Sequence, residues 1–234
     1  MKAFWSLAGN SRNFGDQLTP FLFEEILGVR LVRTNENEAP LFCCGSIVEL
    51  IPDNFNGYVL GSGAMYAKTR KDLSRAKVLA LRGKLTQAAC NVGPTVLGDF
   101  GLALRRIVPR NLHPVNEIGE TPHHIIFEAK QNHGTGGFVI DVCLKPWEVV
   151  ERVASCRKIV SSSLHGLVLA DALGIESMWV PDGRVNGDGF KFRDYASAFG
   201  EEIKPNVWRK APLDKVESIS ESLVGLMRGL NADR

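Results

Sequence analysis

The chain of 234 residues has no apolar run of about 18 residues, the length that a membrane-spanning helix needs. Its opening stretch, MKAFWSLAGN, is too short and too quickly polar for a signal peptide. No strong charge imbalance exists either, because 28 basic residues face 26 acidic ones. That balance gives no reason to expect nucleic acid or another strongly charged partner.

Metal and thiol motifs are also missing. The five cysteines form no CxxC pair, and Cys43 and Cys44 are adjacent, so we predict reduced thiols in the cytoplasm and no thiol catalysis. No HExxH spacing exists. His123 and His124 open an expected strand, where neighbours point to opposite faces, and His133 lies apart from them. We therefore predict no metal and no bound cofactor.

The sequence does contain short apolar runs that end in glycine or a polar turn. Such runs are typical of strands that are buried on both faces of a parallel sheet. They fall into two series, 41–46, 58–63, 77–83 and 95–99, then 123–129, 137–142, 157–163 and 177–182. A first strand is expected near residues 3–9, and helices are expected over 19–28, 146–156, 164–174 and 212–230.

A segment rich in proline, asparagine and glycine, residues 110–121, divides the two series. We predict an α/β fold of two Rossmann-like halves, 1–112 and 113–234, with parallel sheets that face one another across a cleft. A single doubly wound sheet is the alternative. No GxGxxG or P-loop pattern is present, so a dinucleotide or Walker-type site is not indicated.

Polar residues gather in turns at the expected carboxyl ends of the strands, where open parallel sheets bind ligands. Four turns in the first half carry them: Asn13, Gly15 and Asp16; Gly61 to Gly63; Arg82 and Lys84; and Asp99. Each alone is equally typical of an ordinary turn or a helix cap.

The stretch SSSLHG, from Ser161 to Gly166, places a histidine on the first turn of a helix that directly follows a strand. A helix N-terminus offers unpaired N–H groups and partial positive charge, and so binds anions. His165 lies off the apolar stripe of that helix. The partial positive charge of the helix N-terminus disfavours a protonated imidazole in the free protein. A bound anion would favour protonation, and a histidine that gains a proton in this way would suit the role of a general acid. A serine-capped helix with a solvated histidine is the alternative.

Six stretches together resemble the polysaccharide pyruvyltransferases, in particular the branch that acts on bacterial exopolysaccharides such as succinoglycan and xanthan. They are NFGDQLTPFLFEEILG, GSG, ALRGKLT, LGDFGLAL, CRKIVSSSLHGLVLADALGI and FKFRDYA, in that order. The resemblance implies a glycosyltransferase-B-like architecture with the site between the halves. It also implies phosphoenolpyruvate as donor, and a pyruvate ketal formed on two hydroxyls of one sugar.

The resemblance assigns roles to single residues. His165 would protonate the donor methylene, Asp16 would orient or deprotonate a hydroxyl, and Arg82 would clamp the donor carboxylate or phosphate. The expected substrate-binding set is Arg82, Lys84, Ser161, Ser162, Ser163, Leu164, Asn13, Gly15, Gly63, Asp99, Lys191, Arg193 and Asp194. Many family members carry Arg before Leu-His where this chain has Ser163, so one anion contact is either missing or supplied elsewhere, by Arg82, Lys84 or Arg193. The chain is also shorter than is typical of the family.

Two other functions are compatible with this architecture. A nucleotide-sugar glycosyltransferase of glycosyltransferase-B type would bind a nucleoside diphosphate sugar instead, and a non-catalytic carbohydrate-binding protein would bind neither donor. The expected acceptor is a saccharide. If it is lipid-linked, as in the likened branch, the protein would contact the inner face of the cytoplasmic membrane without spanning it. The stretch 179–196, rich in glycine and aspartate, is either a lid or a long connection.

Overall fold

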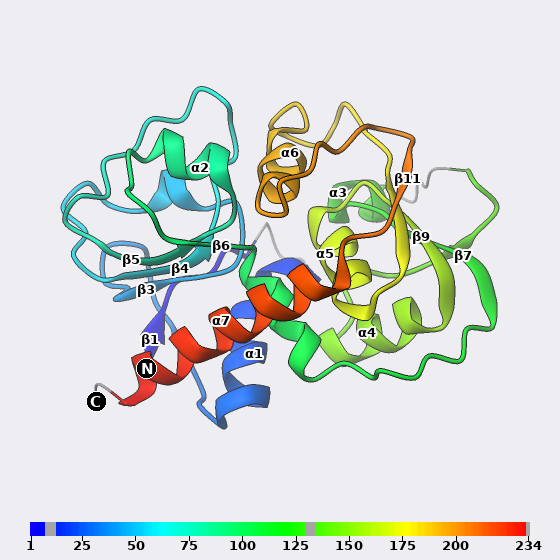
Figure 1. Ribbon diagram of the computed structural model, residues 1–234, viewed down its shortest axis with the longest axis horizontal. Helices are drawn as coiled ribbons and strands as arrows, with labels where there is room; N and C mark the ends of the chain where they lie inside the picture. The colour runs from blue at the N-terminus through cyan, green and yellow to red at the C-terminus, as the bar shows by residue number, and fades with distance from the viewer. Residues whose placement is uncertain (8–12, 130–133, 233–234) are drawn as a thin grey trace.

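A computed structural model describes residues 1–7, 13–129 and 134–232 of the chain (Figure 1). His133 lies outside the described residues. The strands are β1 Lys2–Ala3, β2 Val32–Arg33, β3 Leu41–Phe42, β4 Tyr58–Ser62, β5 Lys77–Leu81, β6 Val96–Leu97, β7 Asn116–Thr121, β8 Phe138–Val139, β9 Cys156–Ser161, β10 Glu176–Trp179 and β11 Trp208–Arg209. The helices are α1 Phe14–Leu27, α2 Lys84–Ala89, α3 His124–Glu128, α4 Pro146–Ala154, α5 Leu164–Leu173, α6 Phe190–Ser197 and α7 Leu213–Ala232, with the 3-10 turns η1 Val48–Leu50 and η2 Phe100–Arg106.

Two separate sheets confirm the predicted α/β class and rule out the single doubly wound sheet. One has the order β3-β4-β5-β6 and is parallel throughout. The other has the order β11-β10-β9-β7-β8 and is parallel except for β11 at its edge. The short β1 pairs with β2, and Phe4 makes a bridge to Phe42 beside β3. The apolar runs form these strands because both sheet faces are covered, as parallel sheets require.

Helix α1 begins five residues earlier than the sequence predicts. Asn13 caps it by accepting a hydrogen bond from the Gly15 N–H at 3.1 Å. Pro20 lies inside the helix, and Thr19, the first residue of the expected range, is buried and accepts from the Cys44 N–H at 3.1 Å. The correction is that 13–16 are cap and first-turn residues of a helix, not a free turn. The helix ends as predicted, at Gly28 in the left-handed region with φ 67°.

The prediction for residues 110–129 was wrong in two places. The stretch 116–121, expected in a connection, is β7 and lies inside the second sheet, between β8 and β9. Residues 124–128, expected in a strand, form α3 instead. The β7 sequence NEIGET lacks the apolar run on which the strand predictions depended, although Glu120 and Thr121 are buried.

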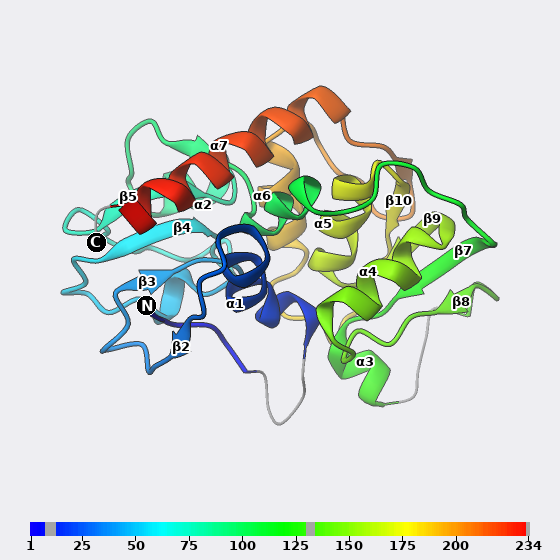
Figure 2. The same ribbon diagram turned by 90° about the horizontal axis from the view of Figure 1, so that it is seen from below.

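One continuous core joins the two sheets. It contains Leu41 and Leu60 near the first sheet, and Ile159 and Leu167 near the second. Helix α1 lies between the sheets and packs on α4 and α5, while α7 runs back across η2 to β6 and β4 (Figures 1 and 2). The second sheet lies wholly after residue 112, but α7 packs on the first, so the division at 112 stays a prediction. No described helix combines the length and the apolar character needed to cross a membrane.

Candidate active site

Three helices begin at one small cavity between the sheets. Asn13 caps α1, Ser163 precedes α5, and Gly189 precedes α6. The cavity measures about 230 Å³, which is below the range of roughly 300–1,000 Å³ usual for drug-sized ligands. It is lined by Ser6, Asn13, Asp16, Gly45, Ser46, Ile47, Met65, His123, His124, Ile125, Ser163, Leu164, His165, Asn186 and Lys191. The partial positive charge of three helix N-termini favours a small anion there.

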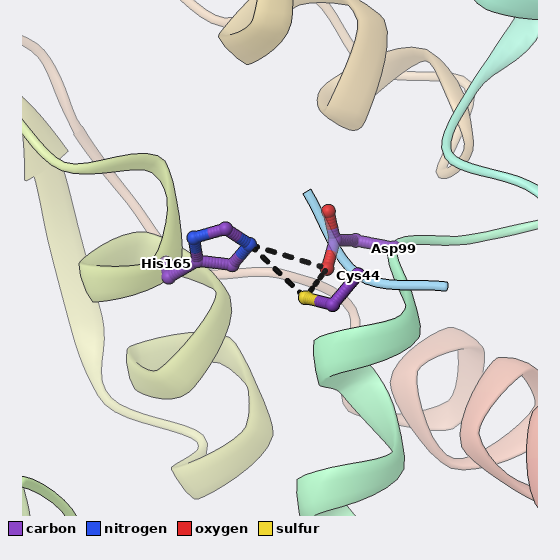
Figure 3. A group of neighbouring side chains, drawn as sticks. All are labelled: Cys44, Asp99 and His165. Atoms are coloured by element: carbon purple, nitrogen blue, oxygen red, sulfur yellow. Dashed lines mark hydrogen bonds and ion pairs between the residues drawn. The ribbon is translucent and has the colours of Figure 1, made fainter. Parts of the chain in front are cut away.

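His165 lies deep at this cavity, with only 12% of its side chain exposed. Its Nε2 is 3.2 Å from the Cys44 sulfur and 3.8 Å from Asp99 Oδ1 (Figure 3). Its Nδ1 edge faces the backbone of Gly15, where a Cβ would come within 1.9 Å of Nδ1. The alternative of a solvated histidine is therefore wrong, because α1, η2 and the Cys44 loop hold the ring on both sides.

The electrostatic surroundings keep His165 neutral in the free protein. Burial lowers its pKa, and the nearby charges of Lys191 and Arg82 lower it further. The carboxylate of Asp99 acts in the opposite direction. An anion in the cavity would raise this pKa, since it would offset the positive neighbours.

Lys191 is the buried cation of the cavity, with 5% exposure. Burial lowers its pKa to about 8, with a further contribution from Arg82, while Asp16 acts to raise it. Asp16 lines the same cavity, and its Oδ2 accepts from the Asn13 side-chain amide at 3.4 Å. The structure therefore brings together Asn13, Asp16, His165 and Lys191 as predicted.

The three serines of the SSSLHG stretch have different surroundings. Ser161 is fully buried and its hydroxyl donates to the carbonyls of Thr121 and Ser163 at 2.9 and 2.7 Å. Ser162 is also buried and accepts from the His123 N–H at 2.9 Å. Ser163 and Leu164 line the cavity. Only the last of the three serines therefore faces a ligand in this arrangement.

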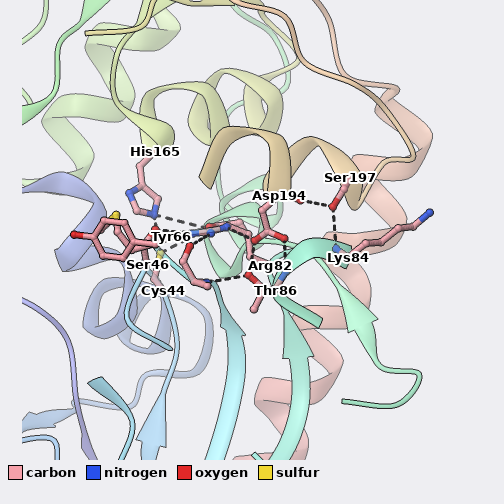
Figure 4. A network of polar contacts seen from close by, with 12 residues as sticks. Cys44, Ser46, Tyr66, Arg82, Lys84, Thr86, His165, Asp194 and Ser197 are labelled. Atoms are coloured by element: carbon pink, nitrogen blue, oxygen red, sulfur yellow. Dashed lines mark hydrogen bonds and ion pairs between the residues drawn. The ribbon is translucent and has the colours of Figure 1, made fainter. Parts of the chain in front are cut away.

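Arg82 is fully buried and bonded at each of its nitrogens (Figure 4). Nε donates to Asp194 at 2.8 Å, Nη1 to the Ser46 hydroxyl at 2.6 Å, and Nη2 to the Ala64 carbonyl at 2.5 Å. Gly63 permits this packing, because a Cβ there would lie 2.1 Å from the guanidinium carbon. Ser46 lines the cavity and Arg82 does not. The anion-clamp role of Arg82 stays a prediction.

Asp194 ties α6 to the first half of the chain. Its carboxylate also accepts from the Thr86 N–H and hydroxyl at 2.8 and 2.6 Å, and Lys84 N–H donates to Ser197 at 2.8 Å. The Lys84 and Arg193 side chains are exposed outside the cavity. Neither replaces, in this geometry, the arginine that precedes Leu-His in many family members.

Asp99 lies beneath His165 without reaching the cavity. It is fully buried and caps η2 through the Gly101 N–H at 2.9 Å, while its Oδ2 has no partner among the described residues. Cys44, Asp99 and His165 are the group of described residues whose donor atoms lie within 4.8 Å of one another. Burial raises the Cys44 pKa well above its ordinary value, as does Asp99, so the thiol is protonated. The prediction that no metal binds stays a prediction.

The predicted site residues did not include Ser46, His123 and His124, which line the cavity, or Cys44, which lies beside it against His165. Cys44 and Ser46 follow β3 directly, at a strand end that the ligand-site rule covers, so that signal was available. His123 and His124 follow β7, and the strand wrongly expected over 123–129 hid them. Their ring centroids are 4.3 Å apart and both side chains line the cavity, so they do not point to opposite faces as predicted.

Comparison with known proteins identifies the class. Residues 39–182 match the polysaccharide pyruvyl transferase family model. Over 213 residues the chain is 30% identical to the uncharacterised protein L143 of Acanthamoeba polyphaga mimivirus, covering 81% of this chain and 72% of L143. It is 29% identical over 222 residues to the succinoglycan biosynthesis protein ExoV of Rhizobium meliloti (strain 1021), covering 86% of this chain and 65% of ExoV. The chain belongs to the polysaccharide pyruvyl transferase family.

A solved structure, that of the uncharacterised protein KP1_0663 from Klebsiella pneumoniae, also resembles the chain. It has a TM-score of 0.44 and 13% identity, and the match covers 79% of this chain and 84% of the other.

Proposed function

We propose that this protein transfers the pyruvyl group of phosphoenolpyruvate to two hydroxyls of one sugar residue, forming a pyruvate ketal. One observation carries the proposal beyond the family: a buried histidine and a buried lysine line a small cavity at which three helices begin. That cavity suits a compact, doubly anionic ligand. Membership of the family supports pyruvyl transfer to a polysaccharide and does not favour the glycosyltransferase alternative.

The first step is protonation of the donor methylene by His165. The donor raises the pKa of the imidazole, so the ring holds a proton, and the Asp99 carboxylate, 3.8 Å from Nε2, stabilises its positive charge. The electron pair of the double bond forms the new C–H bond, and the neighbouring carbon becomes electron-poor. A sugar hydroxyl attacks that carbon and loses its proton, for which Asp16 is the proposed acceptor.

The second step releases phosphate. The bond between the same carbon and the phosphate oxygen breaks, and its electron pair leaves with the phosphate. A second hydroxyl of the sugar then attacks and completes the ketal. Of the two hydroxyl protons, one replaces the proton given to the methyl group and the other leaves with the phosphate. The overall reaction is therefore redox-neutral and needs no oxidant or reductant.

The acceptor follows from the relatives. The match to a succinoglycan biosynthesis protein supports a saccharide, for which a lipid-linked repeat unit is our proposal. Such an acceptor would bring the protein to the inner face of the cytoplasmic membrane. The matched segment makes up 65% of the length of that relative.

A ligand panel tests the donor. Phosphoenolpyruvate is expected to raise the melting temperature more than uridine or guanosine diphosphate sugars do, because a ligand that binds only the native state stabilises it. With a suitable acceptor, phosphate release should depend on both substrates. A clear shift with a nucleotide sugar and none with phosphoenolpyruvate would support the glycosyltransferase alternative, and no shift with either would support a binding protein without this chemistry.

A further inference from the structure

Two adjacent histidines, His123 and His124, form one wall of the cavity. His123 caps the N-terminus of α3 and His124 is its first residue, with ring centroids 4.3 Å apart and the planes 37° from parallel. The Ser162 hydroxyl accepts from the His123 N–H and so fixes the backbone of the pair. Lys191 and His165 line the same cavity from α6 and α5.

The Nδ1 atoms of the two rings make few hydrogen bonds to the described residues. His123 Nδ1 is buried and makes no hydrogen bond within the described residues. His124 Nδ1 has one contact, at 3.4 Å to the side-chain amide of Asn13, which is itself a cavity residue. A buried polar atom without a partner is costly, and a bound ligand would satisfy it.

The charges that face the pair keep both rings neutral in the free protein. Burial lowers the pKa of His123 to about 3, Lys191, His124 and His165 lower it too, and Asp182 opposes them. Burial and Lys191 lower the pKa of His124, and Glu128 opposes them. A phosphate dianion would reverse the balance, because it adds negative charge where the neighbouring groups are positive.

We propose that the His123–His124 pair binds the phosphate group of the donor and takes up a proton as it does so. This inference rests on the proposed function and names the groups that hold one end of its substrate. A phosphate ester has a second pKa near 6, so an imidazole can share a proton with it at neutral pH. Lys191 remains as the fixed cation beside the pair.

Calorimetric titration with phosphoenolpyruvate, in HEPES and Tris at pH 7.5, tests the inference, since the difference in heat counts protons taken up. We expect His123→Asn and His124→Asn each to weaken binding about tenfold or more, as expected for losing a charge-assisted hydrogen bond. Each variant should also take up fewer protons than the wild type. The double variant should show both losses at least as strongly. His113→Asn, at an exposed site remote from the cavity, is the matched control and should match the wild type.

Two further probes separate the possible failures. Inorganic phosphate should lose affinity in the histidine variants, whereas oxalate, a dianion without phosphorus, should keep it, and melting curves check that each variant is folded. Wild-type affinity and proton uptake in the folded double variant would overturn the role of the pair and leave the proposed function intact. If the wild type binds inorganic phosphate but not phosphoenolpyruvate, the proposed function fails. The affinity of the histidine variants for inorganic phosphate then still shows whether the pair binds phosphate.

Discussion

The backbone of Gly15 lies against the imidazole of His165, so that a Cβ at Gly15 would come within 1.9 Å of Nδ1. Two motifs that are 150 residues apart in the sequence therefore meet in one contact: the first turn of α1 and the first turn of α5. The glycine is needed here for close approach and not for a special backbone conformation, because it lies within α1.

Gly15→Ala is expected to displace the ring of His165, because the added Cβ would overlap its Nδ1 while Cys44 and Asp99 lie at its Nε2. Turnover should fall by roughly 10²-fold or more, the range for a misplaced general acid, while the protein stays folded. Gly93→Ala, where a Cβ meets nothing within 4 Å, is the control. Phosphate release and a melting curve for both variants check this. Unchanged turnover in Gly15→Ala would show that the contact does not position His165.

The Arg82–Asp194 ion pair is expected mainly to stabilise the folded protein. Both side chains are fully buried, and removing one partner of such a pair typically costs about 3–5 kcal/mol, so Asp194→Asn should destabilise the protein by about that order. The control Asp53→Asn breaks the pair with Lys71, in which Asp53 is 96% exposed, and should cost less than about 1 kcal/mol. Urea unfolding measures both variants.

The same variant decides between two roles for Arg82. If the guanidinium only holds Ser46 and α6 in place, phosphoenolpyruvate should bind folded Asp194→Asn no more tightly than the wild type. A clear gain in affinity would instead indicate that the freed guanidinium reaches the donor, as the anion-clamp hypothesis requires.

Cys44 touches His165 without being a nucleophile. Burial and Asp99 hold the pKa of its thiol well above the ordinary value, so almost no thiolate exists near pH 7. Cys44→Ala should therefore lower turnover by less than about tenfold, compared with the 10²–10⁴-fold typical of a missing catalytic group. Phosphate release by this variant measures the effect, and a loss as large as that of a His165 variant would contradict the assignment.

Elements with a strong local signal could be predicted from the sequence. The apolar runs before glycine became β3 to β6, and Gly28 and Gly174 end their helices in the left-handed conformation. The polar β7 and the short α3 could not be predicted, because burial between neighbouring strands and not local pattern decides them. The helix expected from residue 19 begins at Phe14 instead, because the Asn13 cap decides its start.

The sequence allowed those site residues to be predicted that lie at the N-terminus of a helix. Asn13, Asp16, Ser163, His165 and Lys191 all line the cavity, since the first turns of α1, α5 and α6 meet there. The surroundings of Arg82 could not be predicted from the sequence. From the sequence an arginine after a strand suggests an anion ligand, and only the fold shows that Arg82 is buried and paired with Asp194, 112 residues later in the chain.

Lys191 is expected to lower the stability of the free protein. Burial brings its pKa from 10.5 to about 8, a difference equivalent to about 3 kcal/mol. Between these values the unfolded chain binds more protons, so wild-type stability should rise with pH over that interval. Lys191→Met should therefore be more stable than the wild type by up to about 3 kcal/mol below pH 8, with the gain disappearing toward pH 10.5.

Urea unfolding at pH 7 and pH 10 measures this difference, and the exposed Lys84→Met is the control, for which no pH-dependent gain is expected. The same Lys191→Met protein should bind phosphoenolpyruvate about 10- to 100-fold more weakly, because it loses a charged hydrogen-bond donor. A variant less stable than the wild type at both pH values would contradict the assignment of Lys191 as a strained, functional cation.

His165 is the residue on which the proposed chemistry depends. His165→Gln should still fold and bind phosphoenolpyruvate, because Ser163, Lys191 and the helix N-termini remain, but it should lose turnover by roughly 10²–10⁴-fold. Wild-type turnover should fall as pH rises, because the donor-bound imidazole loses the proton that it must deliver. The pKa seen in that profile should lie above that of the free protein, in which burial, Lys191 and Arg82 hold it low.

The measurement is phosphate release with an acceptor sugar from pH 5 to 10, beside a melting curve at each pH. The exposed His113→Gln is the control and should keep both the wild-type rate and the wild-type profile. If His165→Gln lost donor binding instead of turnover, the ring would be an anion ligand and not the acid. If the folded variant turned over at near the wild-type rate, the proton would have to come from another side chain of the cavity that can carry one, such as His124 or Lys191.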